Sequence, residues 1–141
     1  SDITTEGLWL PSEVTVKWTG HQQYSVTTAS GNNSGRYVKI LLPRNDYLSL
    51  AEVQVIGANG TNLALSKATS QSSTGWDGVS SRAVDGNISG AYGNGSVTHT
   101  LASSPWWQVD LGAVQQIAEI RIYNRTDCCV ERLNGAKVEV R

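Results

Sequence analysis

One histidine, two arginines and a carboxylate in the second half of the sequence have side chains that could form a polar binding site. His99 is followed, after 25 residues, by Arg125, and Asp127 and Arg132 come soon after it. A sugar presents adjacent hydroxyl groups and a ring oxygen that accept hydrogen bonds, and guanidinium groups offer rigid donor forks that keep their charge. We expect His99, Arg125 and Arg132 to converge as donors, with Asp127 between the two arginines to neutralise and orient them.

Each of these residues also has an ordinary explanation. A single histidine is typical of a core or a surface, and an arginine commonly forms an ion pair at a strand edge. A hydrolase would use His99 with a serine and Asp127, or a pair of carboxylates. The sequence has no nucleophile elbow, and an acid beside an arginine has a lowered pKa that suits a general acid poorly. We therefore expect a binding protein and not an enzyme.

The two cysteines, Cys128 and Cys129, are neighbours in the sequence. This arrangement excludes a conventional disulfide framework and the spaced thiolates of a zinc site. Two alternatives remain. The cysteines either close a strained eight-membered ring, which makes a rigid apolar plate, or stay as two buried thiols.

The length and the net charge of the chain limit the classes of partner that we expect it to bind. The chain has 141 residues, 11 basic and 12 acidic side chains, and a formal charge of -1. One domain of ordinary size is expected, with a neutral partner and no attraction to nucleic acid. No run of about 18 apolar residues occurs, so we expect a soluble chain that does not insert into a membrane and whose leader has been removed.

Period-two alternation rich in Val, Ile and Tyr predicts the strands that must position these side chains. Residues 29–36, 57–61 and 85–96 are rich in Gly, Asn and Ser and predict turns, and residues 49–52 are compatible with one helical turn. The expected fold class is all-β, a β-sandwich or jelly roll. The predicted strands are 14–18, 37–41, 52–55, 107–111, 120–123 and 136–140.

Several segments together resemble the F-type lectin (fucolectin) family, a discoidin-like fold also described as a carbohydrate-binding module. Residues 35–43 and 47–55 resemble the closing strands of that family. The segments that resemble the opening half of the family's domain are 62–73, 82–87, 95–100, 105–112 and 124–133. The resemblance implies a fucose-binding lectin with the same all-β fold.

The order of these halves is reversed relative to the family. The simplest interpretation is a circularly permuted single domain over residues 1–141, in which 1–57 form the family's closing half, 58–61 a junction and 62–141 the opening half. The alternative is a fragment cut across two tandem modules, which would leave bare sheet edges.

The resemblance implies that His99, Arg125 and Arg132 bind fucose. The family usually has 26 residues between the histidine and the first arginine, whereas this chain has 25. The resemblance also implies that Cys128 and Cys129 form a vicinal disulfide that packs against the sugar. The methyl group of fucose needs an apolar pocket, for which Tyr92 and Trp76 are candidates. The adjacent Trp106 and Trp107 should point to opposite faces of one strand, with one of them in the core.

The resemblance further implies a structural Ca²⁺ held by backbone and side-chain oxygens, a ligand set that suits a hard cation. A metal there would fasten the 85–96 loop to the strand after Leu50 and so orient His99 indirectly. The implied ligands are Arg82, Asp85, Asn87, Ser96, Ala51 and Glu52.

The expected partners are fucosylated glycans of the Lewis or H type on cell-surface glycoproteins or glycolipids. Modules of this family deliver toxins and glycosidases to host cells, so we expect an extracellular module of a secreted bacterial parent. Glycans at several sequons would crowd the site, which also favours a bacterial source. The alternative is a discoidin-type module that binds phospholipid or a protein surface through an exposed apolar spike such as Trp76. The sequons are at Asn32, Asn59, Asn87, Asn94 and Asn124.

Overall fold

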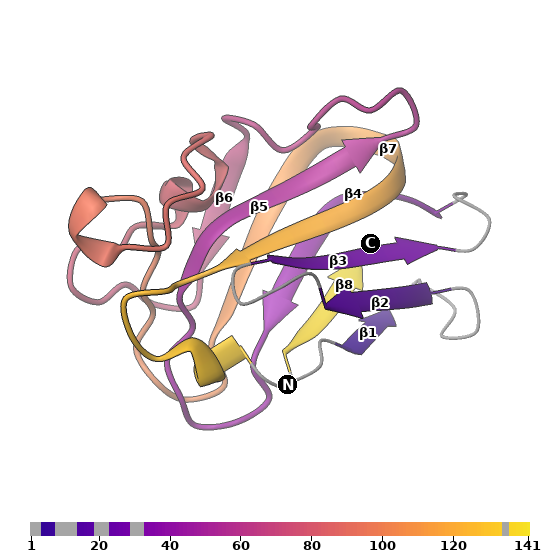
Figure 1. Ribbon diagram of the computed structural model, residues 1–141. Helices are drawn as coiled ribbons and strands as arrows, with labels where there is room; N and C mark the ends of the chain where they lie inside the picture. Colours follow the sequence, from indigo (N-terminus) through magenta and orange to yellow (C-terminus); the bar gives the residue numbers. More distant parts are fainter. Residues whose placement is uncertain (1–3, 8–13, 19–22, 29–32, 134–135) are drawn as a thin grey trace.

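The computed structural model describes residues 4–7, 14–18, 23–28, 33–133 and 136–141, and in these ranges it contains strands and short 3-10 turns but no α-helix. The predicted all-β class is therefore confirmed (Figure 1). The elements are β1 (Thr4–Gly7), β2 (Val14–Trp18), β3 (Gln23–Thr28), β4 (Asn33–Leu41), β5 (Leu50–Gly57), β6 (Ala68–Gln71), η2 (Ser80–Val84), η3 (Tyr92–Asn94), β7 (Trp106–Asn124), η4 (Val130–Leu133) and β8 (Lys137–Val140).

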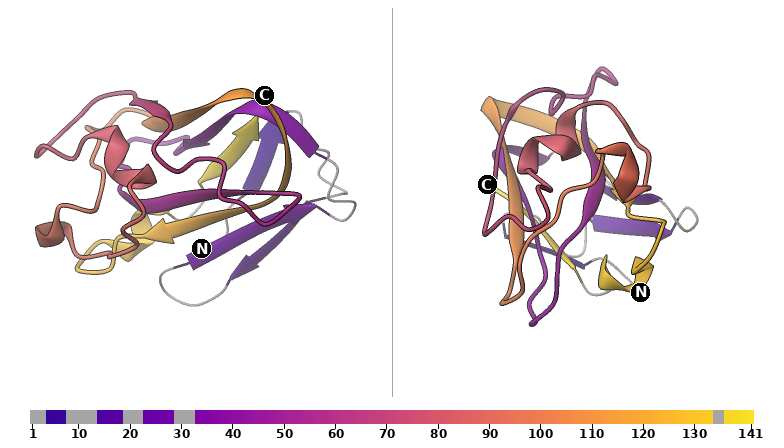
Figure 2. Two further views of the ribbon diagram at one scale, coloured as in Figure 1. Left: turned by 90° about the horizontal axis from the view of Figure 1, so that it is seen from above. Right: turned by 90° about the vertical axis from the view of Figure 1, so that its left-hand side faces the viewer.

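Strand β7 organises the fold because it pairs with four other strands. Its first part pairs with β4 and β6, and its last part pairs with β3 and β5, all antiparallel. A strand has only two edges, so the two parts of this 19-residue strand must have different neighbours. Figures 1 and 2 show this long strand curling across the molecule. The main strand order is β1-β8-β4-β7-β3-β2, with β1 and β8 parallel.

Alternating side chains of these strands fill the space between the layers. Trp107 is fully buried, and its indole Nε1–H donates to the carbonyl oxygen of Ser80 at 3.0 Å. Trp106 lies on the opposite face, where the Lys39 Nζ is 4.9 Å from its ring centroid. The predicted division of the two tryptophans between core and surface is thus confirmed.

Two local predictions are wrong. Residues 49–52 form no helical turn, because Leu50 to Glu52 are extended in β5 and paired with the end of β7. Part of the predicted 29–36 turn belongs to β4, which begins at Asn33, while residues 29–32 lie outside the described ranges. Gly35 is not a turn residue. It allows the backbone of β4 to lie close to Val140, since a Cβ at Gly35 would lie 2.5 Å from the Cγ1 of Val140.

The predicted strands at 107–111 and 120–123 are two parts of β7. The other four predictions also correspond to strands: 14–18 is β2, 37–41 lies in β4, 52–55 lies in β5, and 136–140 is β8 with one extra residue. Strands β1, β3 and β6 were not predicted, because their sequences are short and rich in Thr, Ser and Gln. The loops before β7 and the turn after it gather at one end of the sheets (Figure 2). This end carries the candidate site. In the described ranges no helix has the length and apolar character needed to cross a membrane.

Candidate functional site

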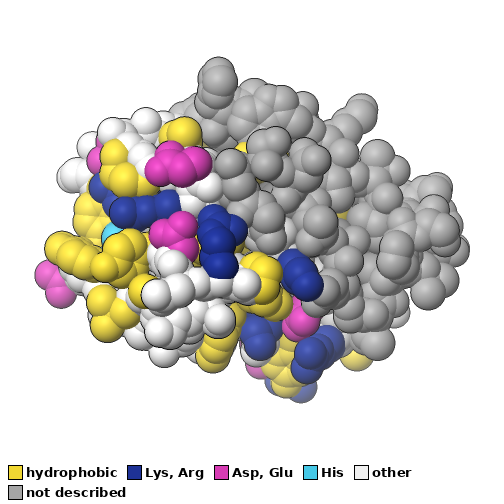
Figure 3. Space-filling view, turned by 90° about the horizontal axis from the view of Figure 1, so that it is seen from below, with side chains coloured by type: hydrophobic (Ala, Val, Ile, Leu, Met, Phe, Trp, Pro, Cys, Tyr) yellow, Lys and Arg dark blue, Asp and Glu magenta, His cyan; other side chains and the backbone are white. Residues whose placement is uncertain are grey.

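The loop end of the sheets contains a pocket of about 340 Å³. Figure 3 shows hydrophobic and Lys or Arg side chains gathered around a histidine on this face. The structure brings together six residues that the sequence had singled out, from segments far apart in the chain, and it adds Tyr47. The lining residues are Tyr47, Trp76, Tyr92, His99, Arg125, Cys128 and Arg132.

Backbone hydrogen bonds on both sides fix the position of His99. On one side, the Thr98 N–H donates to the Leu50 carbonyl oxygen at 2.8 Å, and on the other the His99 N–H donates to the Gly78 carbonyl oxygen at 2.9 Å. Gly78 permits this approach, because a Cβ there would lie 2.4 Å from the His99 nitrogen and 2.8 Å from the Tyr92 hydroxyl. His99 is therefore held in place by backbone contacts of its segment with two other parts of the chain.

The hydrogen bonds of His99 define what its ring offers to a ligand. Nδ1 lies 2.7 Å from the Thr100 carbonyl oxygen, which can only accept, so Nδ1 carries the proton. Burial, and then the charges of Arg132 and Arg125, lower the pKa of His99, so the ring is neutral near pH 7. Nε2 is left as an acceptor, 3.5 Å from the Arg132 Nη1. The expectation of three donors needs correction: the pocket presents two guanidinium donors and one imidazole acceptor.

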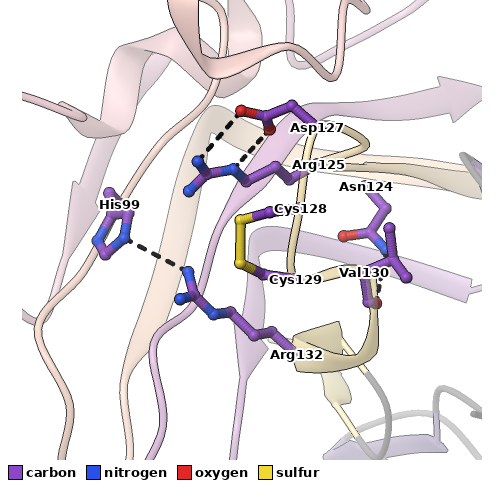
Figure 4. The surroundings of a disulfide bond; sticks show 8 residues. All are labelled: His99, Asn124, Arg125, Asp127, Cys128, Cys129, Val130 and Arg132. Atoms are coloured by element: carbon purple, nitrogen blue, oxygen red, sulfur yellow. Dashed lines mark hydrogen bonds and ion pairs between the residues drawn. A yellow bond between two sulfur atoms is a disulfide. The ribbon is translucent and has the colours of Figure 1, made fainter.

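Arg125 is oriented by Asp127. Its Nε donates to one carboxylate oxygen at 2.7 Å and its Nη2 to the other at 3.3 Å (Figure 4). The hydrogen bonds from Arg125 hold the pKa of Asp127 below its ordinary value, so this pair stays ionised. Among the described interactions Asp127 pairs with Arg125 and not with Arg132, so the carboxylate does not bridge the two arginines as expected.

Cys128 and Cys129 form a disulfide, with 3.7 Å between their Cα atoms. Cys129 has a φ of 63°, a left-handed conformation that a non-glycine residue adopts only when its surroundings hold it there. Figure 4 shows the sulfur pair lying between the Arg125 and Arg132 side chains. The bond thus places a rigid apolar surface between two charged donors, and Cys128 contributes to the pocket wall.

Three aromatic rings surround His99. The ring centroids of Trp76, Tyr47 and Tyr92 lie 4.5, 5.2 and 5.9 Å from that of the imidazole. The Tyr92 hydroxyl donates to the Trp76 carbonyl oxygen at 2.5 Å, which ties the two loops together. Trp76 is 63% exposed, so it forms an outer wall of the pocket and not part of the core. Tyr47 was missed because it lies 52 residues before His99, outside the segment that contains the histidine and the two arginines.

The residues expected to hold a metal are not among those that line the pocket. Glu52 is fully buried, its Oε2 accepts the Gly86 N–H at 2.8 Å, and its Oε1 has no partner. Burial, with a smaller contribution from Asp85, raises the pKa of Glu52 to about 8. A buried carboxylate oxygen without a partner is costly, and a cation beside it would relieve that cost. Glu52 therefore fits a cation ligand.

Among the described interactions, Asp85 is the expected ligand that lies beside this carboxylate, and the other expected ligands are placed by their own hydrogen bonds. In the 85–96 loop, the Asp85 Oδ1 accepts the Asn87 N–H at 2.9 Å, and the Ser96 hydroxyl donates to the Ser89 carbonyl oxygen at 2.6 Å. The Arg82 guanidinium donates to the Val97 carbonyl oxygen at 3.2 Å, so only its backbone oxygen suits a cation. Ala51 likewise offers only backbone. Over the described residues no group of three or more His, Cys, Asp or Glu side chains forms a metal site, so a cation here would need carbonyl oxygens, as Ca²⁺ accepts.

Part of the chain is similar to known proteins. Residues 82–141 match the family described as NedA-like, galactose-binding domain. Fucolectin-4 of Anguilla japonica is 52% identical over 58 residues, which cover 41% of this chain and 32% of the relative. Fucolectin of Anguilla anguilla is 44% identical over 61 residues, covering 43% and 39%. The pentraxin fusion protein of Xenopus laevis is 38% identical over 60 residues, covering 42% and 14%.

Over residues 82–141 these matches support the resemblance to F-type lectins and discoidin-like domains. The matched regions span only about a third of the length of the eel relatives. The segment contains His99, Arg125 and Arg132, whereas Tyr47 and Glu52 come from outside the family-matched range.

Proposed function

We propose that the chain is a fucose-binding lectin module that recognises fucosylated glycans and has no enzymatic activity. The observation that carries this proposal is the convergence of Arg125, Arg132 and His99 on one pocket beside the Cys128–Cys129 disulfide. The similarity to eel proteins named fucolectins supports it. Lewis-type and H-type glycans on cell-surface glycoproteins or glycolipids are the proposed ligands.

The donors and acceptor of the pocket suit one arrangement of sugar hydroxyls. The two guanidinium groups donate to ligand oxygens, while the neutral His99 Nε2 accepts a hydrogen bond from a ligand hydroxyl. The disulfide and the rings of Tyr92 and Trp76 provide apolar contact for a methyl group, which would leave an added hydroxyl without a partner. Such a site favours a 6-deoxy sugar with adjacent hydroxyls.

We further propose that binding depends on Ca²⁺. The partnerless Oε1 of buried Glu52 supports this, together with the oxygen-rich 85–96 loop beside it. When bound, the cation would neutralise Glu52 and join β5 to this loop. The chain's own contribution is to hold the 85–96 loop, and with it Tyr92, against the pocket.

The parent protein is proposed to be extracellular and bacterial, such as a secreted toxin or glycosidase that this module directs to host cells. Asn87 and Asn94 are exposed in the loop beside the pocket, where attached glycans would crowd a ligand. Asn124 is buried and its Nδ2 donates to the Val130 carbonyl oxygen at 2.9 Å, so its side chain is unavailable for glycosylation in the folded state. Asn32 lies outside the described residues.

We also propose the circularly permuted organisation. Residues 57–61 form a tight turn, with Gly60 at a φ of 87° and its N–H donating to the Gly57 carbonyl oxygen at 3.0 Å. Strand β5, before this junction, pairs with β7, which follows it. Light scattering tests the proposal: a monomer is expected, whereas a fragment of two tandem modules would form exchanged dimers.

The second candidate function is a discoidin-type module that binds phospholipid or a protein surface, and the 63% exposure of Trp76 favours it. Binding to phosphatidylserine vesicles that is lost on Trp76→Ala and unaffected by free fucose would support this candidate.

A glycan array in the presence of Ca²⁺, comparing the parent chain with Arg125→Ala, tests the main proposal. We expect signal confined to fucosylated glycans and lost in the variant, because a pocket without Arg125 loses one of its two donor forks. Arg36→Ala is the matched control, since Arg36 forms a comparable ion pair, with Asp110, outside this pocket. No signal from a folded parent chain, or full binding by Arg125→Ala, would contradict the proposal.

A further inference from the structure

The loop between β4 and β5 holds Arg132 by both its backbone and its side chain. The Arg44 Nη2 donates to the Arg132 carbonyl oxygen at 2.6 Å. The Tyr47 ring lies against the other end of the residue, with its centroid 5.1 Å from the Arg132 Cζ. Asp46 joins these two contacts, because it pairs with the Arg44 Nε at 3.5 Å and accepts the Tyr47 N–H at 2.8 Å. Arg44, Asp46 and Tyr47 thus form one connected unit around Arg132.

The two arginines of the pocket are held by different chemistry. Arg125 uses two of its N–H groups on Asp127. For Arg132, no carboxylate lies within ion-pair distance among the described residues, and its guanidinium contacts the Tyr47 ring and His99. An aromatic face orients a planar guanidinium without occupying its N–H donors. Tyr47 can therefore fix the plane of Arg132 without occupying any of its N–H groups, of which Nη1 faces His99.

We propose that Arg44, Asp46 and Tyr47 are positioning residues for Arg132: Arg44 fixes its backbone, and Tyr47 sets the plane of its guanidinium. The proposal rests on the fucose-binding function only for the choice of ligand in the test. The contact between Arg44 and Arg132 joins residues 88 positions apart, so sequence spacing gives no sign of it. The effect of this loop on binding would be exerted through Arg132.

Arg44 allows this idea to be separated from direct contact. Tyr47 lines the pocket, so its loss could also remove a contact with the ligand. Arg44 is not among the lining residues, so a loss of affinity on Arg44→Ala that comes with a changed Arg132 signal supports an effect transmitted through Arg132.

The test uses Tyr47→Leu, Tyr47→Phe and Arg44→Ala in the full chain with Ca²⁺ present. The Arg132 side-chain Nε–H signal is followed by NMR without ligand, and the Kd for methyl α-L-fucoside is measured by calorimetry. Tyr47→Leu and Arg44→Ala should shift or broaden the Arg132 signal and weaken binding by about 3-fold to 30-fold. Tyr47→Phe keeps the ring and should restore both properties. The matched control is Tyr37→Leu. The Arg36 Cζ lies 5.2 Å from the Tyr37 ring centroid, which is the same kind of contact outside the pocket.

The outcomes separate the two proposals. An Arg132 signal that is unchanged in both Tyr47→Leu and Arg44→Ala overturns the positioning role, and a loss of affinity in Tyr47→Leu alone would then identify Tyr47 as a ligand contact. A parent chain that does not bind the fucoside, but whose Arg132 signal changes in the variants, refutes the proposed ligand and supports positioning. If Tyr47→Leu fails to fold, Arg44→Ala still decides the question, because the Arg44 side chain is 37% exposed and tolerates truncation.

Discussion

The two arginines of the pocket show how individual residues divide the work of recognition. Arg125 forms an ion pair with Asp127, whereas Arg132 lies against an aromatic ring and has no carboxylate within ion-pair distance among the described residues. His99 adds an acceptor because its Nδ1 proton is committed to the Thr100 carbonyl oxygen. The pocket therefore selects ligands by the direction of each hydrogen bond as well as by shape.

At this scale, Asp127→Asn is expected to weaken fucoside binding by roughly 3-fold to 10-fold while leaving the melting temperature nearly unchanged. The amide keeps the shape but loses the charge that holds Arg125, and the pair is partly exposed, so its contribution to stability is small. Calorimetry and thermal melts measure the two effects. Glu139→Gln is the matched control, since Glu139 also pairs with an arginine two residues away, Arg141. Equal affinity for Asp127→Asn and the parent chain would remove the orienting role.

The elements around the pocket act through close backbone contacts. The 98–100 segment lies between the start of β5 and the 75–78 turn, and Gly78 allows the second of these contacts. Gly90 has the same role on the other side, where the Thr126 N–H donates to the Gly90 carbonyl oxygen at 2.8 Å. The site is thus built where several loops touch, not on a single element.

We expect Gly78→Ala to abolish fucoside binding and to destabilise the fold by about 1–3 kcal/mol. The new methyl group would overlap the His99 backbone and the Tyr92 hydroxyl, so both would have to move. Denaturant melts and calorimetry test this expectation. Gly93→Ala is the matched control, because a Cβ at Gly93 has no atom within 4 Å. Unimpaired binding by Gly78→Ala would show that the pocket does not depend on this packing.

Across the whole molecule, the proposed cation joins the two sequence halves. Glu52 comes from the half before the 58–61 junction, and the 85–96 loop comes from the half after it. A cation bound at Glu52 would therefore affect both the stability of the fold and, through the 85–96 loop, the geometry of the pocket.

Removal of Ca²⁺ should make stability fall as pH rises. The folded-state pKa of Glu52 is raised from 4.5 to about 8, so its contribution to stability is fully present below 4.5 and is lost as the pH rises toward 8. Thermal melts between pH 5 and 8 with a chelator should show this loss, and added Ca²⁺ should abolish it. Glu52→Gln, which cannot titrate, should give a flatter profile and no stabilisation by Ca²⁺. Identical profiles with chelator and with Ca²⁺ would argue against a cation at Glu52.

The sequence by itself determined the all-β class, the opposite faces of Trp106 and Trp107 and the pocket residues other than Tyr47. Strand alternation is a local property, and the spacing of His99, Arg125 and Arg132 is visible in one segment of the chain. The tertiary structure decided what depends on contacts between distant segments: the curl of β7, the proton position on His99, the pairing of Asp127 with Arg125 alone, and the place of Tyr47 against Arg132. These features are set by packing and by hydrogen bonds between residues that the sequence places far apart or leaves with several partners to choose from.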